Sequence, residues 1–138
     1  MDTAIFIDTS YVLALFNTRD QWHRVALEWE TKISARNTPL ITTEFVLTEI
    51  GDALSSTRLR SNGSRVIRAL RTNDRVEMLP ATSDLFESGL ELFESRLDKH
   101  WGLTDCISFV IMNEFEISED LTTDDHFRQA GFNALLID

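Results

Sequence analysis

The stretch that decides the fold is Ala4-Ile5-Phe6-Ile7-Asp8-Thr9-Ser10, in which an apolar run stops at an acid followed by two hydroxyl residues. Four consecutive apolar residues predict a strand that is covered on both faces, as in a parallel sheet. Open α/β sheets bind their ligands at the carboxyl ends of such strands. We therefore expect Asp8 to be the first of several acids that meet there and bind a divalent cation.

Segments with strand and helix character alternate along the rest of the chain. Further strands are predicted at residues 39–42, 76–80, 121–123 and 134–137, and helices at residues 10–17, 20–36, 43–56, 65–72, 83–97, 105–114 and 125–130. The cluster Ser61-Asn62-Gly63-Ser64 predicts a break before the helix at residues 65–72. Alternating strands and helices imply right-handed crossovers. The expected fold class is α/β: one domain over residues 1–138, with three α/β/α layers and a mainly parallel central sheet.

Length and composition limit the classes of protein that need be considered. The 138 residues suit one domain with a single core, and 43% apolar with 26% charged residues is ordinary for a globular protein. No apolar run approaches the ~20 residues of a membrane span, and the N-terminus lacks the pattern of a signal peptide. Cys106 is the only cysteine, which excludes internal disulfides and cysteine-based metal clusters. We therefore expect a cytoplasmic protein without a membrane segment, in which Cys106 belongs to the core.

The charge of the chain is unevenly distributed. A net charge of −10 argues against a generally basic, nucleic-acid-binding surface. The segment 58–75, however, holds six of the thirteen basic residues and one acid, so it carries +5 and the remainder −15. Within it, Arg65, Arg68 and Arg71 recur every three residues and predict one stripe along a helix. This stripe is either a face that binds phosphates or a partner, or a solvated helix face.

Three more acids occupy positions that suit a site shared with Asp8. Asp105 falls in the first turn of the most apolar predicted helix, Asp124 directly follows a predicted strand, and Glu49 lies inside the helix at residues 43–56. Strand ends and the helix starts that follow them share one edge of a parallel sheet, so Asp8, Asp105 and Asp124 should converge. Neighbouring carboxylates repel one another unless a cation neutralises them, and oxygen ligands select Mg²⁺ or Mn²⁺.

Each of these acids also has a structural alternative. Asp105 or Asp124 could stabilise a helix N-terminus, and Glu49 could be a solvated helix residue. Asp125 adjoins Asp124, so position alone does not decide which of the two carboxylates faces the site. His126 is of the residue type that most often acts as a catalytic base.

Four segments of the chain occur in the order and at the separations of a known family. They are Ile7-Asp8-Thr9-Ser10, Thr48-Glu49, Leu103-Thr104-Asp105-Cys106-Ile107-Ser108-Phe109 and Leu121-Thr122-Thr123-Asp124-Asp125-His126-Phe127. Together they resemble the PIN-domain ribonucleases, in particular the VapC-type toxins of toxin–antitoxin pairs, from residue 5 to the C-terminus. The resemblance implies that Asp8, Glu49, Asp105 and Asp124 bind Mg²⁺ or Mn²⁺ and support RNA cleavage. It also matches Ser10 and Thr123 to hydroxyl positions that line the site, favours Asp124 over Asp125 as the acid that faces the metal, and makes His126 a structural neighbour of Phe127.

The resemblance implies partners as well as chemistry. The expected reaction is hydrolysis of an RNA phosphodiester bond by a metal-activated water. A cognate antitoxin would insert a C-terminal segment into the site, often with an arginine against the acids, and homodimers are common in the family. Arg65, Arg68 and Arg71 would then face RNA or a partner. Two alternatives stay open: a PIN-fold nuclease of RNA processing without an antitoxin, and a catalytically inactive PIN-fold binding module.

Three other families that pair a strand with acids fit the sequence less well. A haloacid-dehalogenase-type phosphatase requires a second acid where this chain has Ser10. A receiver domain requires paired acids after the first strand and a lysine late in the chain, whereas the last lysine here is Lys99. A metal-adhesion module requires Asp-x-Ser-x-Ser, and its last position is Val12 here.

Overall fold

Strand β1 (Ile5–Ile7) is the central strand of the sheet, and all three of its residues are buried. The computed structural model describes residues 3–138. β1 pairs with β2 (Leu40–Thr43) on one side and with β4 (Glu119–Leu121) on the other. The order β3-β2-β1-β4-β5 is completed at the two edges by β3 (Val76–Leu79) and β5 (Asn133–Ala134). All four pairings are parallel, which confirms the predicted sheet type.

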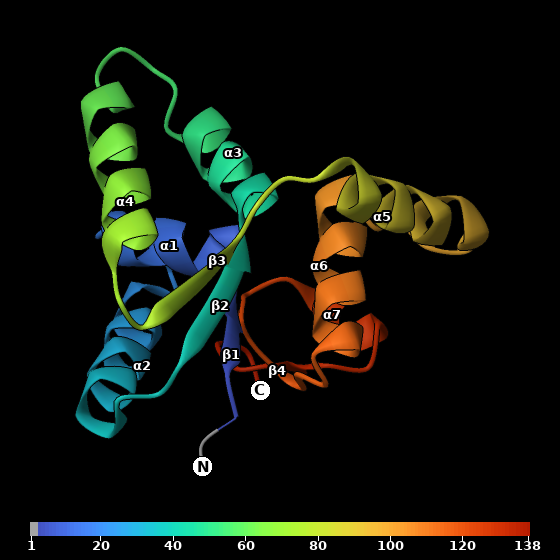
Figure 1. Cartoon of the computed structure of the whole chain (residues 1–138). Coiled ribbons are helices and arrows are strands. Elements are labelled where there is room, and N and C mark those ends of the chain that lie inside the picture. Colours follow the sequence, from blue (N-terminus) through green and yellow to red (C-terminus); the bar gives the residue numbers. More distant parts are fainter. Residues whose placement is uncertain (1–2) are drawn as a thin grey trace.

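Helices cover both faces of this sheet, as the alternation of elements predicts. Helices α1, α2 and α4 lie on one side of the sheet, and α5, α6 and α7 lie on the other (Figure 1). The three-layer α/β/α architecture is therefore confirmed. None of the helices within residues 3–138 is long and apolar enough to cross a membrane. The seven helices of this part of the chain are α1 (Thr9–Phe16), α2 (His23–Arg36), α3 (Glu44–Ala53), α4 (Arg60–Thr72), α5 (Ser83–Ser95), α6 (Leu103–Glu114) and α7 (Asp125–Gln129).

Helix α6 lies deep in the molecule and anchors the C-terminal half of the core. Six of its residues are buried, including Cys106 and Phe109. The ring of Phe109 meets Trp101 and Phe127 edge-on, at centroid distances of 5.0 and 4.9 Å. Trp101 is buried and donates from Nε1 to the Gln129 side chain of α7, so it packs against the end of the chain as expected. This packing holds the first turn of α6 at the edge of the sheet where β1 ends.

The predicted break at residues 61–64 is wrong, because these residues lie inside α4, which begins at Arg60. A Cβ atom on Gly63 would lie only 3.0 Å from the Cβ of Leu54, the residue that ends α3. Gly63 therefore allows the two helices to approach closely. A glycine that serves this packing gives the same sequence signal as a turn.

Strand β4 is the second place where the structure differs from the prediction. It spans residues 119–121 rather than 121–123, because its ladder with β1 ends where Ile7 pairs with Leu121. The final strand is likewise shorter, at residues 133–134 instead of 134–137. The position of β4 places Asp120 in an inner strand of the sheet, although aspartate is among the residues that strands disfavour.

Candidate metal centre at the carboxyl edge of the sheet

The four predicted acids come from four segments that meet at the carboxyl edge of the sheet. Asp8 follows β1, Glu49 lies on α3, Asp105 belongs to the first turn of α6, and Asp124 caps α7. Their charges act on one another: Asp105 and Glu49 raise the pKa of Asp8, and Asp124 raises the pKa values of Glu49 and Asp105. The structure therefore brings the four acids together.

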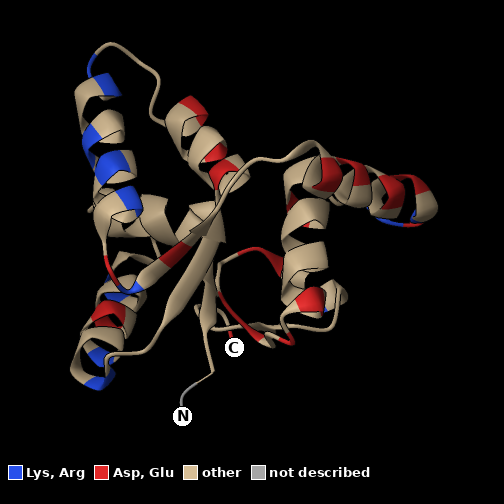
Figure 2. Ribbon diagram, in the orientation of Figure 1, with Lys and Arg blue, Asp and Glu red and all other residues tan. Residues whose placement is uncertain are grey.

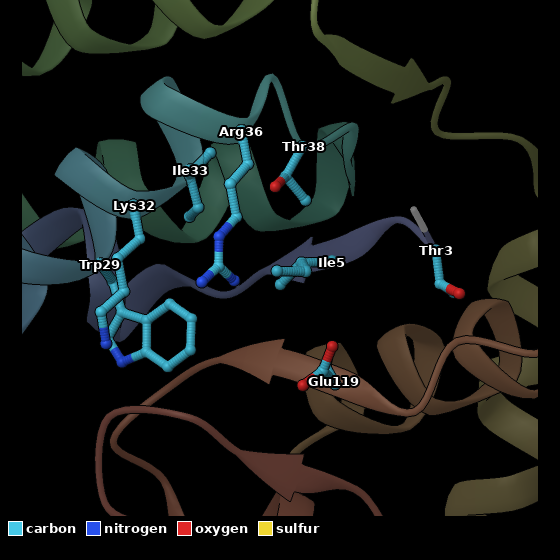
Figure 3. Close-up of a pocket in the computed structure, with 8 residues that line it drawn as sticks. All are labelled: Thr3, Ile5, Trp29, Lys32, Ile33, Arg36, Thr38 and Glu119. Carbon is cyan, nitrogen blue, oxygen red and sulfur yellow. The ribbon is translucent and has the colours of Figure 1, made fainter. Parts of the chain in front are cut away.

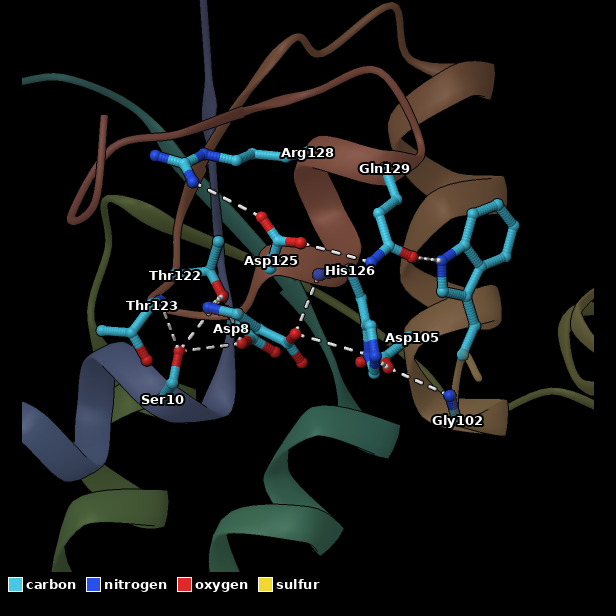
Figure 4. Close-up of polar contacts among 12 residues, drawn as sticks. Asp8, Ser10, Gly102, Asp105, Thr122, Thr123, Asp125, His126, Arg128 and Gln129 are labelled. Carbon is cyan, nitrogen blue, oxygen red and sulfur yellow. Dashed lines mark hydrogen bonds and ion pairs between the residues drawn. The ribbon is translucent and has the colours of Figure 1, made fainter. Parts of the chain in front are cut away.

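Asp8 is the most deeply buried of the four, with 4% of its surface exposed. Its Oδ2 atom accepts hydrogen bonds from Thr122 Oγ1 at 2.8 Å and from Ser10 Oγ at 3.0 Å (Figure 4). Burial, together with the charges of Asp105 and Glu49, raises the pKa of Asp8 to about 7, although the two hydroxyl donors act in the opposite direction. The site therefore accommodates an ionised Asp8 only at a cost in free energy.

The hydroxyl residues around Asp8 form a small network. Ser10 Oγ is 3.1 Å from Thr122 Oγ1 and accepts from the Thr123 N–H at 2.9 Å. Thr122, which the sequence does not single out, donates its hydroxyl to Asp8 and accepts from the Asp124 N–H at 2.9 Å. It meets Asp8 because it is the residue in register with Asp8 on the neighbouring strand.

Glu49 is half-buried on α3 and is oriented by a residue that the sequence reading did not assign. Its Oε1 accepts a hydrogen bond from the Thr9 hydroxyl. Burial raises the pKa of Glu49, and the nearby charges of Asp105 and Asp124 act in the same direction. Thr9 is one of the two hydroxyl residues directly after Asp8, and that adjacency is the only signal that could have identified it.

Asp105 stabilises the start of a helix and also lies within the acid cluster. Its Oδ2 accepts from the Gly102 N–H at 3.0 Å, so the carboxylate does stabilise the start of α6. The same oxygen lies 3.1 Å from His126 Nδ1. Burial raises the pKa of Asp105, and Asp124 raises it as well. The other oxygen, Oδ1, has no hydrogen-bond partner within residues 3–138 and is available to a ligand.

The structure also decides between the neighbouring acids 124 and 125. Asp124 Oδ1 accepts from the His126 N–H at 2.9 Å and lies 3.3 Å from His126 Nδ1. Asp125 is exposed and turns toward Arg128 and Gln129, at 3.4 and 3.2 Å (Figure 4). Asp124 therefore faces the cluster. The ring of His126 lies between two of the acids, with Nδ1 3.1 Å from Asp105 Oδ2 and 3.3 Å from Asp124 Oδ1.

The donor atoms of this cluster suit a hard divalent cation. Ligand atoms of Asp105, Asp124 and His126 all lie within 4.8 Å of one another. A further acid, Asp120 of β4, is fully buried nearby, and neither of its carboxylate oxygens has a hydrogen-bond partner in residues 3–138. A buried carboxyl group with a raised pKa and few donors is unfavourable in its charged form, and a bound cation compensates that charge. A set made mostly of carboxylate oxygens fits Mg²⁺ or Mn²⁺.

The arginines of α4 lie outside this cluster, on the far side of α3. Arg60, Arg68 and Arg71 line a groove between α3 and α4, whereas Arg65 is exposed outside it. Figure 2 shows basic residues along the length of α4. Arg71 also lies 3.8 Å from Glu44 of α3. The stripe predicted from residues 65, 68 and 71 is therefore divided, and only two of its members share the groove.

A separate hollow lies at the opposite edge of the sheet, where β1 and β4 begin. It is lined by Ile5, Glu119, Trp29, Lys32 and Arg36, among others (Figure 3). Two bases and one acid line this hollow, and none of the four candidate acids does. We therefore assign it no role in the chemistry.

Comparison with known proteins agrees with this geometry. Residues 5–133 match the model of the PIN domain. The crystal structure of VapC20 from Mycobacterium tuberculosis, described as a toxin that cleaves the sarcin–ricin loop, superposes with a TM-score of 0.81. The match has 27% sequence identity and covers 95% of this chain and 98% of that one. A search of curated protein sequences returned no match. Because the family model spans nearly the whole chain and the acids stand at the edge that the fold predicts, this chain belongs to the PIN domain family.

Proposed function

We propose that this protein is a Mg²⁺- or Mn²⁺-dependent ribonuclease, and that it is the toxin of a toxin–antitoxin pair. The observation that carries the proposal is the buried Asp8, held by two hydroxyl donors beside Glu49 of α3 and Asp105 of α6. Clustered acids that raise one another's pKa values are typical of functional sites. The similarity to the VapC20 toxin supports the same class of activity.

Each residue of the site has a definite task in such a reaction. Asp8, Glu49, Asp105 and Asp124 would hold the cation, which when bound supplies an activated water and offsets charge on the phosphate. Ser10 and Thr122 orient Asp8 through its Oδ2, which leaves Oδ1 for a ligand. The Thr9 hydroxyl orients Glu49. The Gly102 N–H and the His126 ring hold Asp105 in the first turn of α6.

The groove between α3 and α4 is the surface that we propose for the flanking RNA backbone. Guanidinium groups bind phosphate oxygens in a bidentate geometry, and three arginines line this groove. Helix α3 belongs to both places, because it carries Glu49 for the acid cluster and Gly51 for the groove, which Leu54 and Ser55 directly after the helix also line. A strand of RNA that crosses α3 would place one phosphate at the acids and others along α4.

A cognate antitoxin and a second copy of the chain are the protein partners that we propose. The buried acids would attract an arginine-bearing antitoxin segment, in keeping with the net charge of −10. Phe86 and Phe93 of α5 and the adjoining Leu97 are 42, 44 and 94% exposed, and such apolar groups on a monomer indicate an interface. Light scattering of wild type and Phe93→Glu tests the dimer. A monomeric wild type would contradict it.

The proposed activity is tested with purified protein and a defined RNA. Because VapC20 is described as cleaving the sarcin–ricin loop, a hairpin of that loop is the first substrate, with a scrambled hairpin of equal length beside it. We expect cleavage in Mn²⁺ or Mg²⁺, none in EDTA, and none by Glu49→Gln. Asp125→Asn, an exposed neighbour, should cleave as wild type does.

Two outcomes would contradict the proposal. Cleavage that survives both EDTA and Glu49→Gln would show that the acids are not the reacting centre. Tight, cation-independent binding of RNA without cleavage under any condition would instead support the inactive binding module.

A further inference from the structure

Asp120 is an acidic residue in the buried interior of the sheet, where a charge is very unfavourable. It lies in β4 next to the central strand and has 0% of its surface exposed. Both of its carboxylate oxygens lack a hydrogen-bond partner within residues 3–138. Buried polar groups in proteins are nearly always hydrogen-bonded, and an isolated ionised carboxylate is very unfavourable in an apolar interior. Packing alone does not account for an aspartate here.

The register between β1 and β4 places the side chain of Asp120 on the face of the sheet that carries Asp8. Phe6 pairs with Asp120 and Ile7 with Leu121, so Asp8 and Thr122 are the next pair along the two parallel strands. Residues two apart in a strand share a face, and the 2.8 Å bond from Thr122 to Asp8 verifies this alignment. Asp120 therefore lies one step, roughly 6.6 Å, below the Asp8–Thr122 pair and directly under the acid cluster.

Asp120 also belongs to the cluster electrostatically. Burial raises its pKa well above the ordinary value, and the charges of Asp8, Asp105 and Asp124 raise it further. These are the same acids that we assign to the cation. A cation bound among them would also attract the Asp120 carboxylate, because charges interact more strongly in a buried environment than in water.

A second unpartnered group lies on the helix that supplies Asp105. Ser108 is buried, its Oγ has no hydrogen-bond partner in the described part of the chain, and it follows Asp105 by three residues. Positions three apart lie on one face of a helix, so Ser108 lies one turn deeper than Asp105. Both the sheet and α6 therefore present, on the inner side of the acids, a polar group that has no hydrogen-bond partner within residues 3–138.

We propose that Asp120 is a fifth acid of the cation site, which extends the site inward from Asp8 and contributes to the binding of a divalent cation, directly or through a bound water. Ser108 is the neutral polar group that accompanies it. This inference rests on the proposed cation-dependent function. It assigns the unpartnered carboxylate a ligand of definite chemistry, a hard divalent cation such as Mn²⁺ or Mg²⁺.

The test is a titration of the full chain with Mn²⁺ at pH 7, followed by the electron paramagnetic resonance signal of free Mn²⁺. Asp120→Asn keeps the shape of the side chain and removes its charge. We expect it to weaken Mn²⁺ binding about tenfold or more, an effect of the size of one lost charged interaction. Asp125→Asn, which removes an exposed carboxylate beside the site, should stay within about twofold of wild type.

A thermal melt in EDTA separates this role from a merely structural one. If Asp120 is held for the cation, Asp120→Asn should melt in EDTA at or above the temperature of wild type while binding Mn²⁺ more weakly. Asp120→Leu, which suits the apolar surroundings, repeats the test if the asparagine variant folds poorly. A Mn²⁺ affinity within twofold of wild type in either folded variant would overturn the proposal and leave Asp120 as a neutral core acid.

Failure of this inference and failure of the proposed function give different results. If wild type binds no Mn²⁺, the cation-dependent function itself is wrong. If wild type binds Mn²⁺ and Asp8→Asn weakens that binding but Asp120→Asn does not, the function stands and only the fifth acid is wrong.

Discussion

The acids at the carboxyl edge and the arginines of α4 are two concentrations of charge built in opposite ways. Arg65, Arg68 and Arg71 are exposed along one helix, where water and salt screen their charges. Asp8 and Asp120 are buried, and burial together with like charges from neighbouring elements raises the pKa of each. Exposed charges of one sign cost little stability, whereas a buried carboxyl group either keeps its proton or requires a ligand that compensates its charge.

The largest effect on RNA cleavage is expected when one acid of the cluster is removed. Asp8→Asn or Asp105→Asn should lower RNA cleavage by about 10³-fold or more, because each removes a ligand of the cation that activates water and neutralises the phosphate. In EDTA at pH 8 the same variants should be no less stable than wild type, since each relieves repulsion among the acids. Single-turnover cleavage and thermal melts measure the two effects. Mg²⁺-dependent activity that survives in both variants would refute the site.

The pH dependence of stability is the next effect in size. Asp8 has a folded pKa of about 7 against an ordinary value of 3.8, so the folded state keeps a proton that the unfolded state has already lost. Its contribution is complete below pH 4 and is lost as pH rises through 7, a total of roughly 4 kcal/mol, of which roughly 3 falls between pH 5 and pH 8. Glu49 and Asp105, whose pKa values are also raised, act with the same sign.

Denaturant titrations in EDTA at pH 5 and pH 8 measure this difference. Asp8→Asn is the matched control and should lose most of the pH dependence that Asp8 contributes. Saturating Mn²⁺ should restore stability chiefly at the higher pH, because the cation binds the ionised acids. A cation-free protein that is more stable at pH 8 than at pH 5 would contradict the assigned direction.

A smaller effect distinguishes the two neighbouring threonines. Thr122→Val removes the hydroxyl that donates to Asp8 Oδ2 at 2.8 Å while it keeps the shape of the side chain. A hydrogen bond to a charged group contributes about 1.5–3 kcal/mol, so cleavage or Mn²⁺ affinity should fall by roughly 10- to 100-fold. Thr123→Val, which leaves the backbone N–H to Ser10 intact, should change either quantity by less than about twofold. Equal losses in the two variants would contradict the register-based assignment.

The smallest expected effect concerns the arginines. Arg68→Ser should weaken RNA binding about three- to tenfold and reduce the salt dependence of binding by about 0.7 of a logarithmic unit per decade, the value of one single-strand phosphate contact. Arg65→Ser, on the same helix but outside the groove, is the control and should bind nearly as wild type does. Catalytically inactive Asp105→Asn provides the background for both, so that RNA stays intact during filter-binding titrations. Equal RNA binding by the Arg68→Ser and Arg65→Ser variants would indicate that these arginines form a solvated helix face.

Much of the site followed from the order of residues along the chain. Asp8 and Asp124 were found because each follows a strand, and the four quoted segments identified the family. Two residues of the site do not follow from the sequence: Thr122, because the resemblance matches Thr123 instead, and Asp120, because it precedes the strand predicted at residues 121–123, whereas β4 spans residues 119–121. A strand of three residues that contains two acids has too weak a periodicity to define its own bounds.

What the sequence by itself determined is the alternation of strands and helices and the presence of acids at strand ends, since both depend on short-range patterns of residue type. Only the tertiary structure decided which hydroxyl meets Asp8 and which of two adjacent aspartates faces the cluster. It also showed that Asp120 has no hydrogen-bond partner within residues 3–138. The reason is physical. The bond from Thr122 to Asp8 joins residues 114 apart, and the register that aligns them is set by the pairing and packing of whole strands, which no local pattern encodes.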